Sequence, residues 1–291
     1  MAALEKGTAE TAAYDAVLVD EAQDFGCSWF KCVKLALKDP DDGDLLIVGD
    51  GSQSVYRTRP FTWADAGIKA QGRVISSRMQ LDINYRNTAE ILAVAQPFAG
   101  TATPENAIEG PSAIRVLAIS ADKAIRHGPR PTLIQLADRQ AEIDAAVQLV
   151  GGWVREGLEL AGKQVALAPS DIAVLYPHRS PGAQPLLDQL QARLTGAGIA
   201  VARLSGNLPH ADPSSPGLKL STFHSIKSLQ FRAVVVIWAD LLPSRLPDRT
   251  PEGDRSLMYV ALTRAEDILA ITCSGASPFV NDIAAAISSK G

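Results

Sequence analysis

An acidic segment near the start of the chain carries side chains suited to metal and phosphate chemistry. Asp20 and Glu21 directly follow the apolar run 16–19. A carboxylate at the carboxyl end of a parallel strand lies at the crevice where ligands bind. In a nucleotide hydrolase, Asp20 there would hold Mg²⁺ through water, and Glu21 would polarise the attacking water. The alternative interpretation is a solvated acidic turn, which is a common feature of protein surfaces.

Four further segments with polar side chains follow at intervals. They read VGDGSQSVY at 48–56, NYRN at 84–87, TFHSIK at 222–227 and MYVALTRA at 258–265. With the acidic segment, and in this order, they resemble motifs II to VI of the UvrD/Rep-like superfamily-1 DNA helicases. Phe25, directly after the acidic segment, resembles the DEAQDF-bearing members of that group. The resemblance covers about residues 15–98 and 170–275.

The resemblance implies an ATP-dependent motor that moves on single-stranded DNA, with ATP and Mg²⁺ as cofactors. It assigns the metal to Asp20 and the role of general base to Glu21. Gln53 would contact the γ-phosphate, because its amide can donate to a phosphate oxygen and accept from the attacking water. Arg86 and Arg264 would hold the γ-phosphate from the other side of the cleft, since a guanidinium binds phosphate oxygens in a planar fork. Outside such motifs, a surface ion pair would be the preferred interpretation of either arginine.

The same resemblance implies contacts with single-stranded DNA. Tyr56 would lie against the bases, where stacking contributes about 1–3 kcal/mol per base. Arg57 and Arg59 add positive charge for the phosphates. The family usually carries an aromatic residue two positions after this tyrosine, and that position holds threonine here. Phe61 or Trp63 could substitute for it, or could simply pack in the core.

The fourth segment departs from the family pattern. Thr222 and His224 match positions that the family places near the DNA backbone or the cleft. The family's Lys-Gly-Leu-Glu reads KSLQ at 227–230. Ser228 cannot approach a phosphate as closely as glycine, and a positive φ disfavours it. Gln230, a candidate nucleotide contact, keeps hydrogen-bonding capacity but loses the charge.

A phosphate-binding loop of the form G-x-x-x-x-G-K-[ST] is the family's first motif. It precedes the acidic segment by far more than the nineteen residues that precede Asp20. The segment 157–164 has the glycine and lysine spacing, but it ends in Gln164 and follows a predicted helix, so we interpret Gly157 as a helix C-cap. The sequence therefore predicts part of one motor domain and all of a second, with a protein or chain segment as a partner that supplies the loop.

Short apolar runs alternate with helical patterns, which indicates an α/β fold with parallel sheets flanked by helices. By resemblance these are RecA-like motor domains, one partial and one complete. We expect the first domain at 1–100, a linker or crossover at 101–131 and the second domain at 132–291. The predicted strands are 16–19, 45–48, 79–83, 132–136, 172–176, 199–204, 218–221, 233–238 and 268–272. The predicted helices are 29–37, 87–97, 138–157, 186–194 and 254–263.

The composition is that of a globular protein. The chain has 291 residues, of which 46% are apolar and 21% are charged. This composition excludes a disordered chain and a disulfide scaffold. A net charge of −4 gives no basic footprint for nucleic acid, although a basic groove can lie on an acidic protein. Three cysteines and four histidines show no metal-ligand spacing. Without a leader pattern or an apolar run near ~18 residues, we expect a soluble, cytoplasmic chain.

Two other functions stay open. One is a catalytically inactive helicase-like module that binds single-stranded DNA or a partner protein, which the altered fourth segment favours. The other is an oligomeric scaffold that keeps only the fold, with its motif residues paired in closed salt bridges. The retained Glu21, Gln53, Arg86 and Arg264 favour the ATPase, because a module that only binds has no evident use for all four.

Overall fold

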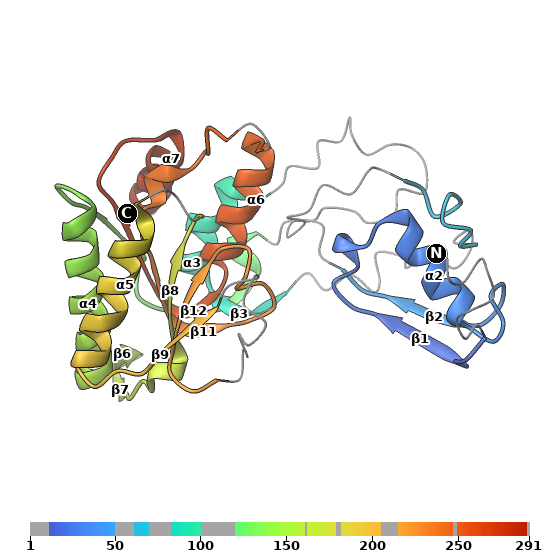
Figure 1. The fold of residues 1–291 in the computed structure, drawn as a ribbon, viewed down its shortest axis with the longest axis horizontal. Helices are drawn as coiled ribbons and strands as arrows, with labels where there is room; N and C mark the ends of the chain where they lie inside the picture. The colour runs from blue at the N-terminus through green and yellow to red at the C-terminus, as the bar shows by residue number, and fades with distance from the viewer. Residues whose placement is uncertain are drawn as a thin grey trace. The chain divides into compact units, whose positions relative to one another are not determined.

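A computed structural model describes residues 12–49, 61–69, 83–99, 120–160, 162–178, 182–204, 215–246 and 249–289 (Figure 1). The chain divides into two compact units. Unit 1 comprises residues 1–81 and 100–118, and unit 2 comprises residues 82–99 and 119–291. The NYRN segment at 84–87, which the motif order places in the first domain, therefore belongs to unit 2. The predicted boundaries 1–100, 101–131 and 132–291 stay a prediction.

Unit 1 is built on a small parallel sheet. Strand β1 (Ala16–Val19) pairs in parallel with β2 (Asp44–Ile47), and helix α2 (Cys27–Ala36) connects them. Phe30 of α2 is fully buried, and its ring meets that of Trp63 edge-on at 5.2 Å. Trp29 is 60% exposed, because the neighbouring Phe30 fills the space between the helix and the strands.

Unit 2 is built on a six-stranded parallel sheet with the order β5-β12-β11-β8-β10-β9. All six strands match runs that the sequence predicts. The interiors of β8, β11 and β12 are almost continuously apolar, as expected for strands of a parallel sheet buried on both faces. The α/β fold with a parallel sheet is thereby confirmed. The strands are β5 (Thr132–Gln135), β8 (Ile172–Tyr176), β9 (Val201–Leu204), β10 (Leu218–Thr222), β11 (Phe231–Val236) and β12 (Ala265–Cys273).

Helices cover both faces of this sheet (Figure 1). Helices α4 and α5 pack together on one face, and α3, α6 and α7 lie together on the other. Helix α7 is not among the helices predicted from the sequence. The helices are α3 (Ala89–Ala95), α4 (Arg139–Glu156), α5 (Ala183–Gly196), α6 (Pro251–Leu262) and α7 (Pro278–Ser288).

The caps of α4 are those predicted. Asp138 accepts a hydrogen bond from the N–H of Ala141 at 2.8 Å, and Gly157 ends the helix at φ 72°. Beyond Gly157, β6 (Leu158–Leu160) and β7 (Lys163–Val165) form an antiparallel hairpin. The lysine-bearing segment 157–164 is therefore a hairpin and lacks the strand-to-helix turn of a phosphate-binding loop.

The NYRN segment differs from its predicted form. The run 79–83 lies outside the described residues except for Ile83, and residues 84–88 themselves form a strand, β3 (Asn84–Thr88). It pairs with β4 (Ala124–Arg126), a strand within the predicted linker. The predicted cap Asn87 does not start α3. Thr88 does so, accepting from the N–H of Ile91 at 3.3 Å, because the Asn87 side chain is bonded elsewhere.

The remaining expectations concern cysteines and membranes. All three cysteines are free thiols. Among the described residues, no group of three or more potential metal ligands gathers. None of the helices in the described part of the chain has the length and apolarity needed to cross a bilayer.

Candidate functional site

The acidic turn, residues 20–24, lies at the carboxyl end of the sheet in unit 1. Asp20 is exposed and its Oδ1 accepts the backbone N–H of Glu21 at 2.8 Å. The N–H of Ala22 donates to the carbonyl of Val48 at 3.0 Å, and that of Val48 donates to Val19 at 2.8 Å. The start of this turn is therefore bonded to the end of β2, and the predicted metal ligand and general base are adjacent at this edge.

Glu21 has a left-handed backbone, with φ 52° and ψ 38°. This conformation costs a non-glycine residue roughly 1–2 kcal/mol. Such strain persists where the surroundings impose it, and it is concentrated at functional sites. Here the hydrogen bonds on either side of Glu21 hold its backbone in this conformation, directly after Asp20.

The structure describes only some of the residues of unit 1 that were predicted to contact nucleotide or DNA. Gln53, Tyr56, Arg57 and Arg59 lie outside the described residues. Trp63 is only 9% exposed and packs with Phe30 and Phe61 in the core of the unit. The structure thus gives Trp63 the packing role that the sequence left as the alternative, and not a face on which a base could stack.

In unit 2, Arg264 follows α6 and is 1% exposed. Its Nε donates to the carbonyl of Val260 at 3.0 Å, and its Nη1 donates to the carbonyl of Leu229 at 3.1 Å. Its own carbonyl accepts the N–H of Phe231 at 2.9 Å. Arg264 therefore connects α6 with the end of the 222–230 segment.

The NYRN segment reaches the same place. The Asn87 side chain is buried, and its Nδ2 donates to the carbonyls of Thr263 at 2.9 Å and Ala265 at 2.6 Å. These peptide groups lie on either side of Arg264. The predicted γ-phosphate ligands Arg86 and Arg264 thus belong to segments that are in direct contact within unit 2.

Two further arginines, which the sequence analysis did not single out, surround this contact. Arg126 donates to the carbonyl of Arg86 and to the carboxylate of Asp267. Arg232 donates to the same carboxylate, with Nε at 2.8 Å and Nη2 at 2.7 Å. Asp267 is 2% exposed, so one buried carboxylate is shared by two cations. We call Arg86, Arg126, Arg232 and Arg264 the arginine cluster.

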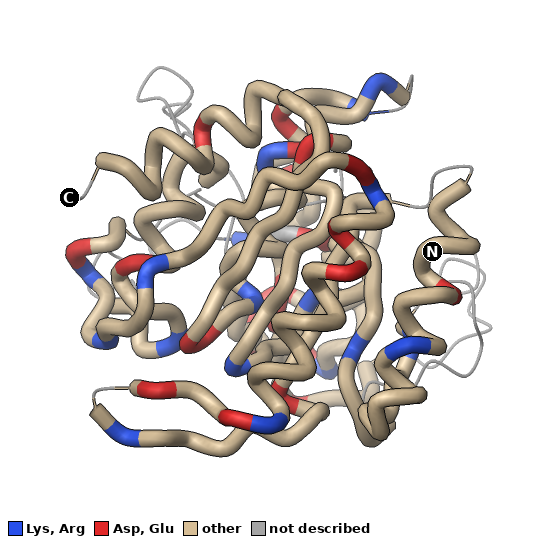
Figure 2. Tube along the Cα trace, turned by 90° about the vertical axis from the view of Figure 1, so that its left-hand side faces the viewer, with Lys and Arg blue, Asp and Glu red and all other residues tan. Residues whose placement is uncertain are grey.

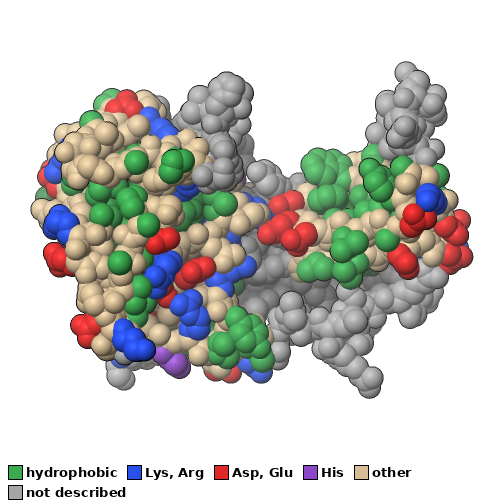
Figure 3. Space-filling view, turned by 90° about the horizontal axis from the view of Figure 1, so that it is seen from below, with side chains coloured by type: hydrophobic (Ala, Val, Ile, Leu, Met, Phe, Trp, Pro, Cys, Tyr) green, Lys and Arg blue, Asp and Glu red, His purple; other side chains and the backbone are tan. Residues whose placement is uncertain are grey.

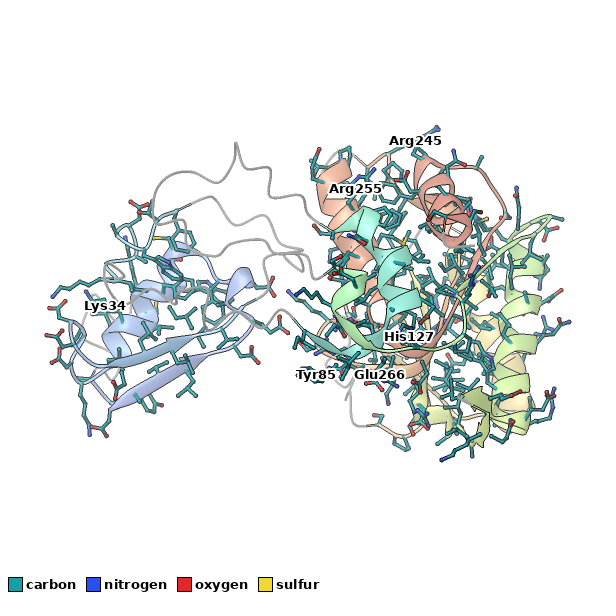
Figure 4. The ribbon with its side chains drawn as sticks, turned by 180° about the vertical axis from the view of Figure 1, so that it is seen from behind. Lys34, Tyr85, His127, Arg245, Arg255 and Glu266 are labelled. Carbon is teal, nitrogen blue, oxygen red and sulfur yellow. The ribbon has the colours of Figure 1, made fainter. Side chains whose placement is uncertain are left out.

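The cluster has an exposed side. Tyr85, next to Arg86, is 67% exposed, and Figure 4 shows it beside Glu266 of β12. An exposed aromatic ring next to arginines can stack on a planar base. Elsewhere, basic and acidic residues are interspersed along the trace (Figure 2). The arginine cluster is therefore a local positive feature and not part of a wholly basic face.

The 222–230 segment forms a tight turn after β10. The hydroxyl of Thr222 accepts the N–H of Ser225 at 3.2 Å and donates to the Ser225 hydroxyl at 3.0 Å. Burial and, to a smaller extent, the nearby charge of Arg249 together lower the pKa of His224 to about 4. His224 is therefore neutral near pH 7. Gln230, at the end of the segment, is exposed.

Ser228 corrects an expectation. A positive φ was expected to disfavour serine at this position, yet Ser228 has φ 69°. The turn therefore keeps the backbone conformation that favours glycine, with a serine in it. The hydrogen bond from Arg264 to the adjacent Leu229 carbonyl helps to impose it.

Comparison with known proteins bears on this assignment. Residues 5–66 match the family model of the UvrD/REP helicase N-terminal domain. No curated protein matches the chain. One similar solved structure is the C-terminal domain of a possible DNA helicase from Lactobacillus plantarum WCFS1, 17% identical, covering 70% of this chain and 96% of that one, with a TM-score of 0.43. The family match confirms the resemblance to UvrD/REP helicases that the order of the motifs predicts.

Proposed function

We propose that this chain is part of an ATP-dependent superfamily-1 DNA helicase or translocase, which couples ATP hydrolysis to movement on single-stranded DNA. The observation that carries the proposal is the contact among three motif segments at Arg264. Asn87 donates to the peptide carbonyls on either side of Arg264, and the Arg264 guanidinium donates to the carbonyl of Leu229. Segments far apart in the sequence thus hold the backbones of Arg86 and Arg264 in one contact, which supports a role for both arginines at one phosphate.

The acidic turn supplies the complementary chemistry. The exposed carboxylate of Asp20, at the carboxyl end of β1, fits the oxygen ligands that Mg²⁺ prefers. When bound there, Mg²⁺ would neutralise charge on the phosphates. Glu21, held beside Asp20, would orient a water molecule and take its proton. Gln53 would contact the γ-phosphate, and Gln230 would contact the nucleotide.

Each unit has its own proposed DNA contacts. Tyr56, Arg57 and Arg59 are the proposed contacts from unit 1, and Thr222 and His224 those from unit 2. Because His224 is neutral near pH 7, its contribution to a phosphate would be a hydrogen bond and not a charge.

A phosphate-binding loop from a partner protein or chain segment would complete the site. The sheet of unit 1 has one face covered by α2, while Leu18 (73%), Leu46 (49%) and Val48 (47%) are exposed. Figure 3 shows hydrophobic side chains gathered on this unit. Parallel sheets are normally covered on both faces. A strand that added in parallel to β1 or β2 would bring its loop to the carboxyl edge, where Asp20 and Glu21 lie.

One observation favours the inactive alternative. Arg264 is almost fully buried and its guanidinium donates to two main-chain carbonyls, so it also has a structural role. A module that binds single-stranded DNA or a protein and hydrolyses nothing would keep these bonds permanently. An ATPase would exchange at least one of them for a phosphate oxygen.

ATP turnover by the purified chain, with and without single-stranded DNA, tests the proposal. We expect turnover that DNA stimulates and that Glu21→Gln abolishes, while Glu159→Gln, an exposed carboxylate of β6, leaves it unchanged. If a supplied phosphate-binding loop is required, the same pattern is expected once a peptide or domain that carries it is added. DNA binding without turnover under both conditions would establish the inactive module.

A further inference from the structure

The side-chain amide of Asn87 links the strand that carries Arg86 to the segment that carries Arg264. It is 2% exposed, and its two N–H groups are divided between the carbonyls of Thr263 and Ala265. Its Oδ1 accepts the Nδ2 of Asn84 at 3.1 Å. The hydrogen-bonding capacity of this amide is therefore used on both sides of the contact.

Asn84 fixes the other end of the link. Its Oδ1 accepts the backbone N–H groups of Arg86 and Asn87, each at 2.8 Å. The backbone of Arg86 is thus held by Asn84, and the backbone around Arg264 is held by Asn87. Since the two amides are bonded to each other, the backbones that carry the two arginines form one hydrogen-bonded unit.

Only a group with two donors fits between these two carbonyls. A carbonyl oxygen accepts and cannot donate. Each of the two carbonyls must therefore be faced by an N–H or O–H donor. A hydroxyl would satisfy one carbonyl and leave the other unpaired, and a carboxylate would repel both. Among uncharged side chains of this size, an amide meets the requirement, whereas a hydroxyl or an apolar group does not.

We propose that Asn87 is a positioning residue that holds Arg86 and Arg264 at a fixed separation, so that the two guanidiniums act on one phosphate group. The phosphate part rests on the proposed function. Holding the separation before the ligand arrives lowers the cost of ordering two long side chains when it binds. Asn87 touches the peptides beside Arg264 and not the phosphate, so it acts through the arginines.

The test observes the arginines directly. In the full chain, labelled with ¹⁵N-arginine and supplied with a phosphate-binding loop where one is needed, the Nε–H signals of Arg86 and Arg264 are assigned by Arg→Lys substitutions and followed with and without ATP. The variants are Asn87→Ala, whose side chain has no donor, and Asn87→Ser, whose side chain has one donor. Two controls accompany them: Asn281→Ala, an exposed amide on α7, and Ile143→Val, a core change in α4 that lowers stability elsewhere in unit 2.

In the wild-type chain we expect both signals to move with one common midpoint in ATP. Asn87→Ala shifts both signals without ligand and weakens binding about tenfold, as expected for two lost hydrogen bonds. Asn87→Ser gives an intermediate result, and both controls behave as the wild type. Unchanged ligand-free signals in folded Asn87→Ala and Asn87→Ser would overturn the positioning role. Wild-type signals that do not shift when ATP is added would instead overturn the phosphate part of the proposal. The ligand-free spectra would still decide whether Asn87 sets the geometry of the two arginines.

Discussion

The acidic turn of unit 1 and the arginine cluster of unit 2 are held in place by different means. Asp20 is exposed on a two-stranded sheet, and a strained backbone places Glu21 beside it. The arginine cluster lies against a six-stranded sheet, and buried side chains such as Asn87 and Asp267 connect its members. A metal ion or water molecule reaches an exposed carboxylate, whereas the geometry of several arginines requires a rigid scaffold.

The comparison predicts where the chain is sensitive to mutation. Removing a carboxylate shared by two cations should affect folding, whereas changes in the acidic turn should affect chemistry far more than folding. Stability and turnover measurements on variants of both units test that difference.

Asp267→Asn should lower the free energy of unfolding of unit 2 by about 3 kcal/mol. The change removes a buried charge and leaves Arg126 and Arg232 without their shared partner. Urea denaturation followed by circular dichroism measures it. Asp282→Asn breaks the exposed pair with Arg255 (3.0 Å) and should cost about 0.5 kcal/mol at most. Equal costs for the two variants would contradict the structural role of Asp267.

His224 should make unit 2 less stable in acid. Its folded pKa of about 4 lies below the ordinary value of 6.5, so between these values the unfolded state binds more protons. Stability is therefore full above pH 6.5 and declines as the pH falls toward 4, by about 2 kcal/mol. Urea midpoints at pH 7 and pH 4.5 measure the loss. His224→Gln should show a smaller decline, and an identical decline would show that other groups cause it.

Glu21→Gly should raise the stability of unit 1 by about 0.5 kcal/mol, because glycine adopts a positive φ without strain and the gain exceeds its added unfolded-state entropy. Thermal unfolding measures the change. Ser228→Gly is the matched change in unit 2 and should behave similarly. Only Glu21→Gly should also abolish turnover. A loss of stability in Glu21→Gly would mean that the side chain, and not the backbone, holds the turn.

Local patterns in the sequence predict most of the fold. The strands of unit 2 contain short apolar runs, and the burial of the central strands β8 and β11 on both faces leaves a nearly continuous apolar signal. Asp138 and Gly157 could be predicted as the ends of α4, because a cap depends on residues that are adjacent in the chain.

The contacts that build the site could not be predicted in this way. Asn87 shows the local spacing of a helix cap, yet its partners are 176 and 178 residues away. Arg126 lies in a stretch whose composition indicates a linker, and its ion pair with Asp267 forms only when β3 and β4 pack beside β12 within unit 2. Trp63 follows a segment predicted to bind DNA, but its ring packs against Phe30 of α2 in the core.

The most direct test of the central claim is a double-mutant cycle on nucleotide affinity at Arg86 and Arg264, in the chain supplied with a phosphate-binding loop where one is needed. Arg245→Ala, an exposed arginine of unit 2 (Figure 4), is the control. If both arginines hold one phosphate, Arg86→Ala and Arg264→Ala should each weaken ATP binding by about tenfold or more. The double variant should lose less than the product of the two single effects. Affinity unchanged in both single variants, with the fold intact, would contradict the proposal that the arginine cluster binds the nucleotide.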